Sequence, residues 1–277
     1  MIDITGKDLP KDHPYYRSNS LAYRKYLEIC GLRTVPTEGG FGWLKSVGGL
    51  FDIAKFERIE TEPDIGTLKK LGFGPGLLIW IPARRAEIPK GWRKMWIRTH
   101  FTQSGFTIID SPEYFKKWNE RARRARKKFL ASDAKIEEVS DFEFIEAFRA
   151  TKVKHLYKND YIKYYRTMTA IAPDDVKSYV VRHGGKIVAG LAVLNYAGNS
   201  SAHLVAFTAP EAKSIQAGTG LIDRWFSDSQ ANGIKYVNFD HLRDSSMTHD
   251  QQGYTDFKRN FMEYSLSYPD SYFRFVG

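Results

Sequence analysis

The chain has 277 residues, of which 42% are hydrophobic and 14% aromatic, so it can bury a packed core and is not disordered throughout. The formal net charge is +10, and the single cysteine, Cys30, excludes both an internal disulfide framework and a multi-cysteine metal site. No apolar run approaches the roughly 20 residues that span a bilayer, and the start of the chain has no apolar signal core. We therefore expect one large or two ordinary domains in a soluble, cytoplasmic protein without stable membrane insertion.

The first 110 residues show helix and strand patterns in alternation. Ser20 is a suitable N-cap for an amphipathic helix, and glycine pairs at 39–40 and 48–49 separate the segments that follow. Apolar and β-branched runs predict strands, so this half is expected to be α/β. The expected elements are a helix over residues 21–31, strands over 51–58, 77–82, 96–101 and 106–109, and a short helix around 65–71.

A strongly basic helix is predicted to follow, over residues 111–130. Ser111, Pro112 and Glu113 combine a serine cap, a proline at the first helical position and an acid in the first turn. Residues 113–130 carry eight Lys or Arg and two Glu, which accounts for +6 of the net +10. Such a basic stripe is suited to tRNA or nucleotide phosphates, but a solvated helix between two domains has the same pattern.

From residue 141 onward the pattern changes from helix to strand and back again. Gly184 and Gly185 form a hairpin signal between the first two of three nearly uncharged apolar runs, which predicts an antiparallel meander with buried strands. A glycine-rich turn then leads into a helix that ends at Asn232 and Gly233. The expected elements are a helix over 141–150, strands over 178–183, 186–196 and 202–208, a helix over 221–229, a strand over 235–240, a short helix over 254–261 and a last strand over 272–276.

This order, with a glycine-rich helix start after the third strand, resembles the core of the GNAT acyltransferase superfamily. The run GIKYVNFD over 233–240 and the run GYTDFKRNF over 253–261 resemble the ending of its FemAB-like branch. Members of that branch are double-GNAT transferases related to the enzymes that add amino acids to peptidoglycan stem peptides. The resemblance covers the C-terminal part of the chain well and the first 110 residues loosely.

The resemblance implies an α/β fold of two tandem GNAT-like domains, with mixed, mostly antiparallel sheets flanked by helices. A degenerate copy would occupy residues 1–110, the basic connecting helix 111–135, and the C-terminal GNAT-like domain 136–277. The third and fourth strands of the C-terminal copy, 202–208 and 235–240, should separate to receive the donor, and the acceptor would lie between the halves.

The implied reaction is transfer of an acyl or aminoacyl group to an amine, on a small molecule or a cell-wall peptide precursor. No tightly bound cofactor is expected; the donor would be acyl-coenzyme A or an aminoacyl-tRNA, which makes tRNA a further partner. A second function from another class is a non-catalytic GNAT-like scaffold that binds nucleic acid or an anionic polymer through the basic helix.

The donor site is predicted at the turn that begins the helix over 221–229. Backbone N–H groups at a helix start, together with the helix dipole, favour phosphate. In the family this turn has the pattern Q/R-x-x-G-x-G/A, and Gly218 and Gly220 fit its small positions, whereas Ile215 occupies the place of the Gln or Arg. An ordinary glycine-rich helix cap remains the alternative. The predicted donor residues are Gln216, Gly218, Thr219 and Gly220.

Lys258 and Asp240 are the predicted catalytic residues. Lys258 follows Phe257 in the family-like F-K pair, and its charge would stabilise an oxyanion or hold a substrate phosphate, unless it is only a surface lysine. Asp240 ends a predicted strand, where a carboxylate can accept the proton of the attacking amine or simply hold the following loop.

The acceptor cleft is predicted at Tyr161, Arg166 and Tyr254, in aromatic and basic segments that are also compatible with ordinary core and rim positions. The seven histidines are scattered without metal-ligand spacing, so no metal site is expected.

Overall fold

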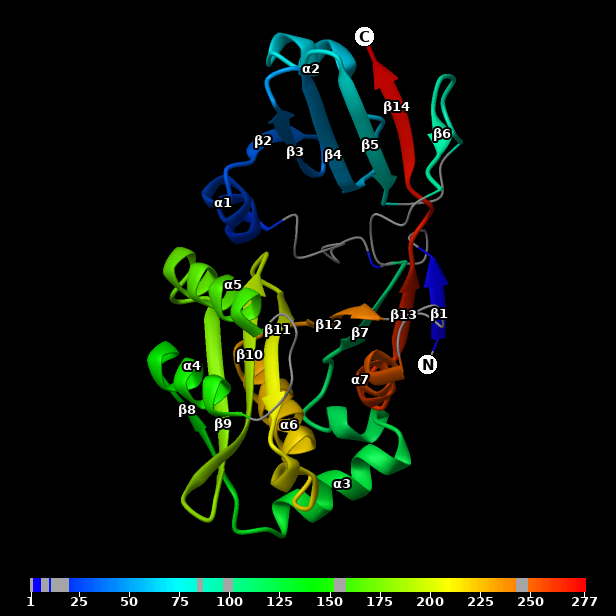
Figure 1. Cartoon of the computed structure of the whole chain (residues 1–277). Coiled ribbons are helices and arrows are strands. Elements are labelled where there is room, and N and C mark those ends of the chain that lie inside the picture. Colours follow the sequence, from blue (N-terminus) through cyan, green and yellow to red (C-terminus); the bar gives the residue numbers. More distant parts are fainter. Residues whose placement is uncertain are drawn as a thin grey trace. The chain divides into compact units, whose positions relative to one another are not determined.

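The computed structural model describes residues 2–5, 10, 20–83, 87–96, 102–151, 158–242 and 249–277 (Figure 1). These residues form two compact units of α/β structure, which confirms the predicted fold class. Among the described residues, no helix combines the length and the apolar character that crossing a membrane requires. Unit 1 comprises residues 105–240 and 248–264, and unit 2 comprises residues 2–104, 241–247 and 265–277.

Unit 1 is a sheet in the order β7-β12-β11-β10-β9-β8 with helices before and after its central meander. Strands β9, β10 and β11 pair antiparallel, and β12 returns parallel to β11 after helix α6. The elements of unit 1 are β7 (Gln103–Ile108), η3 (Tyr114–Lys117), α3 (Glu120–Leu130), β8 (Lys135–Glu138), α4 (Asp141–Ala150), α5 (Lys158–Ile171), β9 (Val176–His183), β10 (Lys186–Tyr196), β11 (Ser200–Thr208), η4 (Pro210–Lys213), α6 (Ala217–Ala231), β12 (Tyr236–Leu242) and α7 (His249–Arg259).

Strands β11 and β12 separate soon after they begin. Residues 200–202 of β11 pair with residues 236–238 of β12, and no pairing joins the rest of the two strands. On its other side, β11 has one extra residue against β10, because Ala192 pairs with Val205 and Val193 pairs with His203. A bulge of this kind bends a strand and increases its twist, which turns β11 away from its neighbour. The predicted gap between these two strands is confirmed.

An aromatic core lies between the sheet of unit 1 and its helices. The Trp118 ring meets Phe226 of α6 edge-on at 5.5 Å and Phe261, just after α7, at 5.0 Å. Phe261 also stacks on Phe239 of β12, with 6.2 Å between the ring centroids. These rings are buried, so the end of α7 is fixed against β12 and α6.

Unit 2 repeats the element order of unit 1 in a smaller form. Strands β2, β3 and β4 form an antiparallel meander, helix α2 follows, and β5 returns parallel to β4. The N-terminal half is therefore a second GNAT-like copy, as predicted. Its elements are β1 (Ile2–Thr5), α1 (Leu21–Ile29), β2 (Arg33–Thr37), β3 (Gly40–Val47), β4 (Phe51–Ile59), α2 (Ile65–Lys70), β5 (Gly76–Pro82), β6 (Arg93–Lys94), β13 (Tyr264–Ser267) and β14 (Tyr272–Val276).

The last strand, β14, corrects the predicted domain boundaries. It spans the predicted residues 272–276, but it pairs antiparallel with β5 in the sheet β2-β3-β4-β5-β14-β6. The chain therefore returns to unit 2 at its C-terminal end and does not close a continuous domain over 136–277. Local sequence patterns identify a strand but not its distant partner. The strand predicted over 96–101 lies mostly outside the described residues.

The helix predicted over 111–130 is also corrected, because it is interrupted at Trp118 and Asn119. A 3-10 turn ends at Lys117, Trp118 is extended (ψ 153°), and α3 begins at Glu120. The Asn119 side chain accepts the N–H of Ala122 at 2.9 Å and so caps a new helix. The interruption lies where the Trp118 ring enters the aromatic core.

Candidate functional site

Helix α6 begins with two backbone N–H groups that have no acceptor among the described residues. Its N-cap residue, Gln216, has a left-handed backbone (φ 61°, ψ 35°), and its side chain does not cap the helix. The Gln216 carbonyl accepts from Thr219 at 2.9 Å and from Gly220 at 3.2 Å. Within the described part of the chain, the N–H groups of Ala217 and Gly218 have no acceptor, so they can bind an anion.

The two glycines of this turn have packing reasons to be small. A Cβ on Gly220 would lie 2.5 Å from the ring of Phe129 on α3, and one on Gly218 would lie 3.2 Å from the ring of Phe257 on α7. Gly220 is therefore needed for the close approach of α3 to α6. Thr219 is buried, so of the four predicted donor residues Gln216 and Gly218 are the more accessible pair.

Helix α7 bridges the gap between β11 and β12 with two residues one turn apart. The hydroxyl of Tyr254 hydrogen-bonds Nε2 of His203, which is the first residue of β11 after its last pair with β12. The ammonium of Lys258 donates to the carbonyl of Phe239, which is the first residue of β12 after that pair. The same ammonium lies 4.5 Å from the centre of the Tyr254 ring. We call His203, Tyr254, Lys258 and Asp240 the splay cluster.

Lys258 is not the surface lysine of the alternative interpretation. Its side chain is only 4% exposed, although lysine is among the residues least often buried. Phe261 is buried beside it, Phe257 is half-buried, and the two rings lie 5.0 Å apart. This packing anchors α7, and it fixes where the ammonium points.

Asp240 lies next to the carbonyl that Lys258 binds. It is 6% exposed, and its backbone has a positive φ of 61°, which residues other than glycine, Asn and Asp rarely adopt. Its N–H donates to Oδ1 of Asn238 at 2.7 Å, a local bond that holds the turned backbone. Among the described residues, four non-glycine residues have positive φ, and two of them, Gln216 and Asp240, are predicted site residues. Local strain of this kind concentrates at functional sites.

His203 belongs to the cluster but was not among the residues predicted from sequence. The spacing of the seven histidines indicates only that they do not form a metal site, and it says nothing about a hydrogen bond between His203 and a distant side chain. A usable signal was present, because His203 interrupts a nearly uncharged apolar run at the strand where the gap was expected.

The predicted acceptor residues are only partly brought together. Tyr254 is in the splay cluster, whereas Tyr161 and Arg166 lie on α5. Five residues on a helix correspond to about 140° around its axis, so Tyr161 and Arg166 do not share a face. Tyr161 is half-buried and Arg166 is exposed. A single wall formed by these three side chains remains a prediction.

The basic segment divides into cations that bind carboxylates and cations that do not. Lys117 forms salt bridges with Asp110 at 2.8 Å and with Glu263 at 3.2 Å. Its hydrogen bond to Asp110 lowers the pKa of that carboxyl group. Arg126 bridges Asp223 at 2.7 Å. Four exposed residues of α3 have no carboxylate partner among the described residues and form a positive face: Arg121, Arg123, Lys127 and Lys128.

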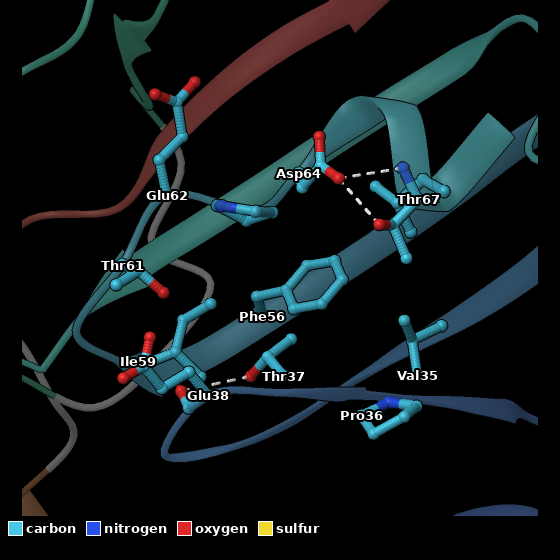
Figure 2. A pocket seen from close by; sticks show the side chains of 12 residues that line it. Val35, Pro36, Thr37, Glu38, Phe56, Ile59, Thr61, Glu62, Asp64 and Thr67 are labelled. Atoms are coloured by element: carbon cyan, nitrogen blue, oxygen red, sulfur yellow. Dashed lines mark hydrogen bonds between the residues drawn. The ribbon is translucent and has the colours of Figure 1, made fainter. Parts of the chain in front are cut away.

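Two cavities lie away from the splay cluster. One of about 170 Å³ in unit 2 has an apolar floor and carboxylates at its rim (Figure 2), but Glu62 there accepts from Trp92 Nε1 at 2.6 Å and Asp64 caps α2. The other, of about 640 Å³, lies where β10 ends and β11 begins and includes none of the predicted site residues. The described residues contain no group of three side chains arranged to hold a metal ion.

Comparison with known proteins agrees with this geometry. Residues 116–259, more than half of the chain, match the acetyltransferase (GNAT) domain family. The fold is similar to the crystal structure of FemX, with a TM-score of 0.71 at 10% identity over 99% of this chain and 96% of that one. It is also similar to a conserved protein of unknown function from Bacteroides thetaiotaomicron, with a TM-score of 0.62 at 10% identity over 94% and 91% of the two chains.

A third similar structure is the C-terminal domain of a putative lysylphosphatidylglycerol synthetase from Agrobacterium fabrum. Its TM-score is 0.56 at 11% identity, over 93% of this chain and 88% of that one. No curated protein matches the chain. The match to FemX extends over both units, so the FemAB-like arrangement of two GNAT-like copies is confirmed as a fold.

Proposed function

Because the chain belongs to the acetyltransferase (GNAT) domain family, we propose that it transfers an acyl or aminoacyl group from an activated donor to an amine. The observation that carries the proposal is the splay between β11 and β12, bridged by Tyr254 and Lys258 of α7. Beyond their last pair, the two strands do not use each other's backbone groups, so a donor can bind along them.

The start of α6 is the proposed phosphate site of the donor. Two N–H groups there have no acceptor within the described ranges, and together with the helix dipole they favour the phosphates of coenzyme A or of a tRNA acceptor end. Both donors contain phosphate, next to the esterified ribose in an aminoacyl-tRNA and one pantetheine arm away from the thioester in acyl-coenzyme A, so either can place a phosphate at this site. The backbone N–H groups of Ala217 and Gly218 would contact it.

Lys258 is the proposed stabiliser of the developing oxyanion. The bond to the Phe239 carbonyl holds its ammonium where β11 and β12 have separated. Burial strengthens the electrostatic effect of the charge, because little water is present to screen it.

Asp240 is the proposed proton acceptor. The lone pair of the amine attacks the acyl carbon, a C–N bond forms, and the bond from the acyl carbon to the donor's sulfur or ribose oxygen breaks. The proton that the amine loses passes to the Asp240 carboxylate and from there to the leaving group. The acceptor is an amine on a small molecule or on a cell-wall peptide precursor. The names of FemX and of the putative lysylphosphatidylglycerol synthetase make an aminoacyl donor worth testing beside acyl-coenzyme A.

The proposal is tested by donor binding to the start of α6. Calorimetry with coenzyme A, acetyl-coenzyme A and an aminoacyl-tRNA should identify a donor whose affinity is abolished by Gly218→Asp, because that change puts a negative charge where the phosphate binds. Ser227→Asp places the same charge on an exposed position of the same helix and should leave affinity unchanged. Circular dichroism verifies folding, and unchanged affinity in a folded Gly218→Asp protein would contradict the site.

A second function is favoured by one observation, the positive face of α3, whose four cations have no carboxylate partner in the part of the chain that the structure describes. We propose it as the alternative: a GNAT-like scaffold that binds nucleic acid or another polyanion without turnover. The double variant Arg123→Gln/Lys127→Gln should then lower affinity for tRNA and reduce the salt dependence by about two charges, since each phosphate contact adds about one unit of slope. Measured turnover with any donor would reject the non-catalytic alternative.

A further inference from the structure

One end of the unit 2 sheet brings several strand ends to the same level. Strand β3 ends at Val47 and β4 begins at Phe51, and these two residues pair across the hairpin. Asp52 of β4 pairs with Gly76, the first residue of β5, and Gly76 pairs with Val276, the last residue of β14. The hairpin tip, the start of β5 and the end of β14 therefore form one continuous edge.

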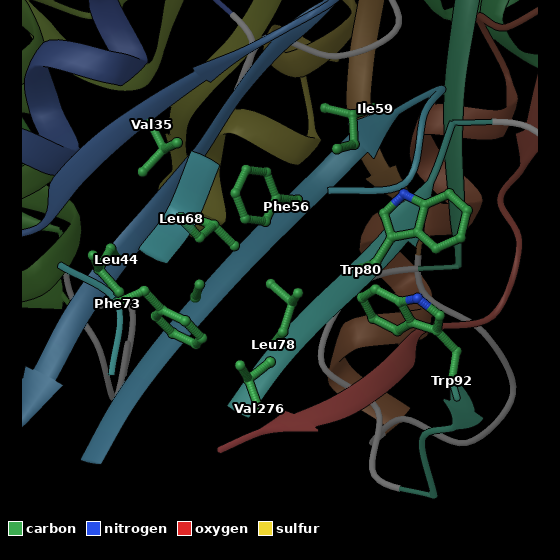
Figure 3. Packing of buried hydrophobic residues seen from close by; sticks show 11 residues of the cluster. Val35, Leu44, Phe56, Ile59, Leu68, Phe73, Leu78, Trp80, Trp92 and Val276 are labelled. Carbon is green, nitrogen blue, oxygen red and sulfur yellow. The ribbon is translucent and has the colours of Figure 1, made fainter. Parts of the chain in front are cut away.

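The two faces of this sheet differ at that edge. The core cluster, which includes Leu44, Ala54 and Leu78, lies on the face that α2 covers through Leu68 (Figure 3). Side chains alternate between the faces of a strand, so neighbours of the core residues point the opposite way. The residues on the opposite face at this end are Lys45, Ile53, Leu77 and Phe275.

The opposite face carries a row of apolar side chains in cross-strand register. Ile53 pairs with Leu77 and Leu77 pairs with Phe275, so the three are neighbours across β4, β5 and β14. Phe275 is 67% exposed, and at the hairpin tip Leu50 is 87% exposed. Large apolar side chains gathered in this way mark a binding surface more often than scattered ones do. We call this set the apolar strip; it consists of Val47, Leu50, Phe51, Ile53, Leu77 and Phe275.

Exposed cations lie at this end of the sheet on both of its faces: Lys45 is on the face of the apolar strip, and Arg33, Lys69 and Lys70 are on the face that α2 covers. Arg33 donates to the Leu71 carbonyl at the end of α2, and Lys69 donates to the Gly277 carbonyl at 3.3 Å. The one acidic side chain at these strand ends, Asp52, accepts the N–H of Gly74 at 2.7 Å.

We propose that this end of unit 2 docks on the surface of an anionic lipid bilayer, with the hairpin tip inserted among the headgroups. Apolar side chains that enter the headgroup region and cations that meet anionic lipid are the two terms that hold peripheral proteins on membranes. Leu50 at the tip is 87% exposed, so it can enter a deformable partner. Nucleic acid would pair with the cations but leave the apolar strip uncovered, and a second copy of this surface would bring like charges together.

The test is cosedimentation of the whole protein with vesicles, and it needs no substrate. We expect binding to vesicles of phosphatidylcholine mixed with phosphatidylglycerol, weak binding to phosphatidylcholine alone, and weaker binding as salt rises. Leu50→Asp should lower affinity about tenfold, because it replaces an inserted apolar side chain with a charge that anionic lipid repels. Lys69→Gln/Lys70→Gln should lower affinity for the anionic vesicles and flatten its salt dependence.

Two controls decide which surface binds. Leu21→Asp changes an exposed leucine on α1 and should leave vesicle binding unchanged. Lys127→Gln/Lys128→Gln removes two cations from α3, and it should have a smaller effect than the change at Lys69 and Lys70. The proposal is overturned if the anionic vesicles do not bind the protein, if Leu50→Asp binds like the unmodified protein, or if the α3 variant alone loses binding. Concentration-dependent dimerisation that Leu50→Asp abolishes, without vesicle binding, would assign the strip to a second copy instead.

Discussion

Each unit has one parallel strand pair at the same place in its element order, β11–β12 in unit 1 and β4–β5 in unit 2. The two pairs differ in how far the strands stay hydrogen-bonded to each other. In unit 1, pairing stops after three residues of each strand, at 202 and 238. In unit 2, pairing continues from Asp52 and Gly76 to Ile59 and Pro82. A closed pair satisfies its backbone groups internally, whereas an open pair must satisfy them with side chains or a ligand. The GNAT element order alone therefore does not leave strand backbone open to a ligand, and the proposed donor site depends on the open pair of unit 1.

The helix starts of the two units differ in the same way. The Asp64 carboxylate at the start of α2 accepts the N–H groups of Gly66 and Thr67, each at 3.0 Å, so this helix start already holds an anion of its own. The start of α6 has no side-chain cap. Both differences point to unit 1 as the unit that takes a donor and to unit 2 as a structural or docking unit.

The largest expected effect is that of Lys258→Met on the proposed reaction. If the ammonium stabilises the oxyanion, kcat should fall about 100- to 1000-fold, which corresponds to roughly 3 to 4 kcal/mol. The variant should also lose stability, by about 1 to 3 kcal/mol, because the Phe239 carbonyl loses a buried donor. An increase in KM with kcat unchanged would assign Lys258 to ground-state binding of the substrate instead.

The control for that experiment is Lys163→Met, which removes an exposed lysine from α5 in the same unit. It should change neither kinetics nor the free energy of unfolding measured in urea. Unchanged kcat and KM in a folded Lys258→Met protein would remove this residue from the site.

Gly76→Ala tests the closed pair of unit 2. A Cβ at this position would lie 2.1 Å from the carbonyl oxygen of Asp52, and backbone cannot move aside as a flexible side chain can. We expect the free energy of unfolding to fall by about 3 kcal/mol, toward the upper part of the range for overpacking. Gly74→Ala is the matched control, since its nearest atom would be 3.5 Å away and it keeps the N–H that Asp52 accepts. Equal stability of the two variants in denaturant melts would show that β4 and β5 can separate without cost.

The sequence allowed the open pair to be predicted but not the cluster that bridges it. The meander, α6 and β12 each have a clear local pattern, and the family-like run over 253–261 placed Lys258 on a helix. The burial of Lys258 and its bond to Phe239 depend on contacts between α7 and β12 that no local pattern encodes. His203 was missed for the same reason, because its partner Tyr254 is distant in sequence.

Two other errors have the same physical origin. The partner of β14 is β5, and a strand's pattern does not identify which edge it joins. The break at Trp118 and Asn119 was visible as a second cap signal, an Asn followed by Glu120, but the stronger start at Ser111 and Pro112 favoured one continuous helix. Competing local signals are decided by packing, here by the burial of the Trp118 ring.

A smaller effect on stability is expected from substitutions of Asp240, where two variants distinguish the role of its backbone conformation from the role of its charge. Its positive φ is strained for a residue with a Cβ, so Asp240→Gly should relieve about 1 kcal/mol of backbone strain while it removes the carboxylate. Asp240→Asn keeps a side chain that tolerates this backbone and removes only the charge. If the carboxylate is the proton acceptor, both variants lose activity, and only the glycine variant gains stability in thermal melts. An active Asp240→Asn protein would restrict Asp240 to shaping the turn.

The smallest expected effect concerns the occupied helix start of α2, and it is measured by pH. The hydroxyl of Thr67 and then the backbone N–H groups of Gly66 and Thr67 bind the Asp64 carboxylate and lower its pKa. An unfolded aspartate has a pKa of about 3.9, so the stabilisation from this cap is complete above that value and is lost as pH falls through the lower, folded pKa. The difference in Tm between the protein and Asp64→Asn should therefore be constant near neutral pH and shrink in acid.

Thr67→Val removes the hydrogen bond that lowers the pKa of Asp64 most. An NMR titration of this variant should therefore give the Asp64 carboxyl a pKa closer to the ordinary value. If that titration does not move, the cap of α2 does not hold the carboxylate, and the contrast with the open start of α6 loses its support.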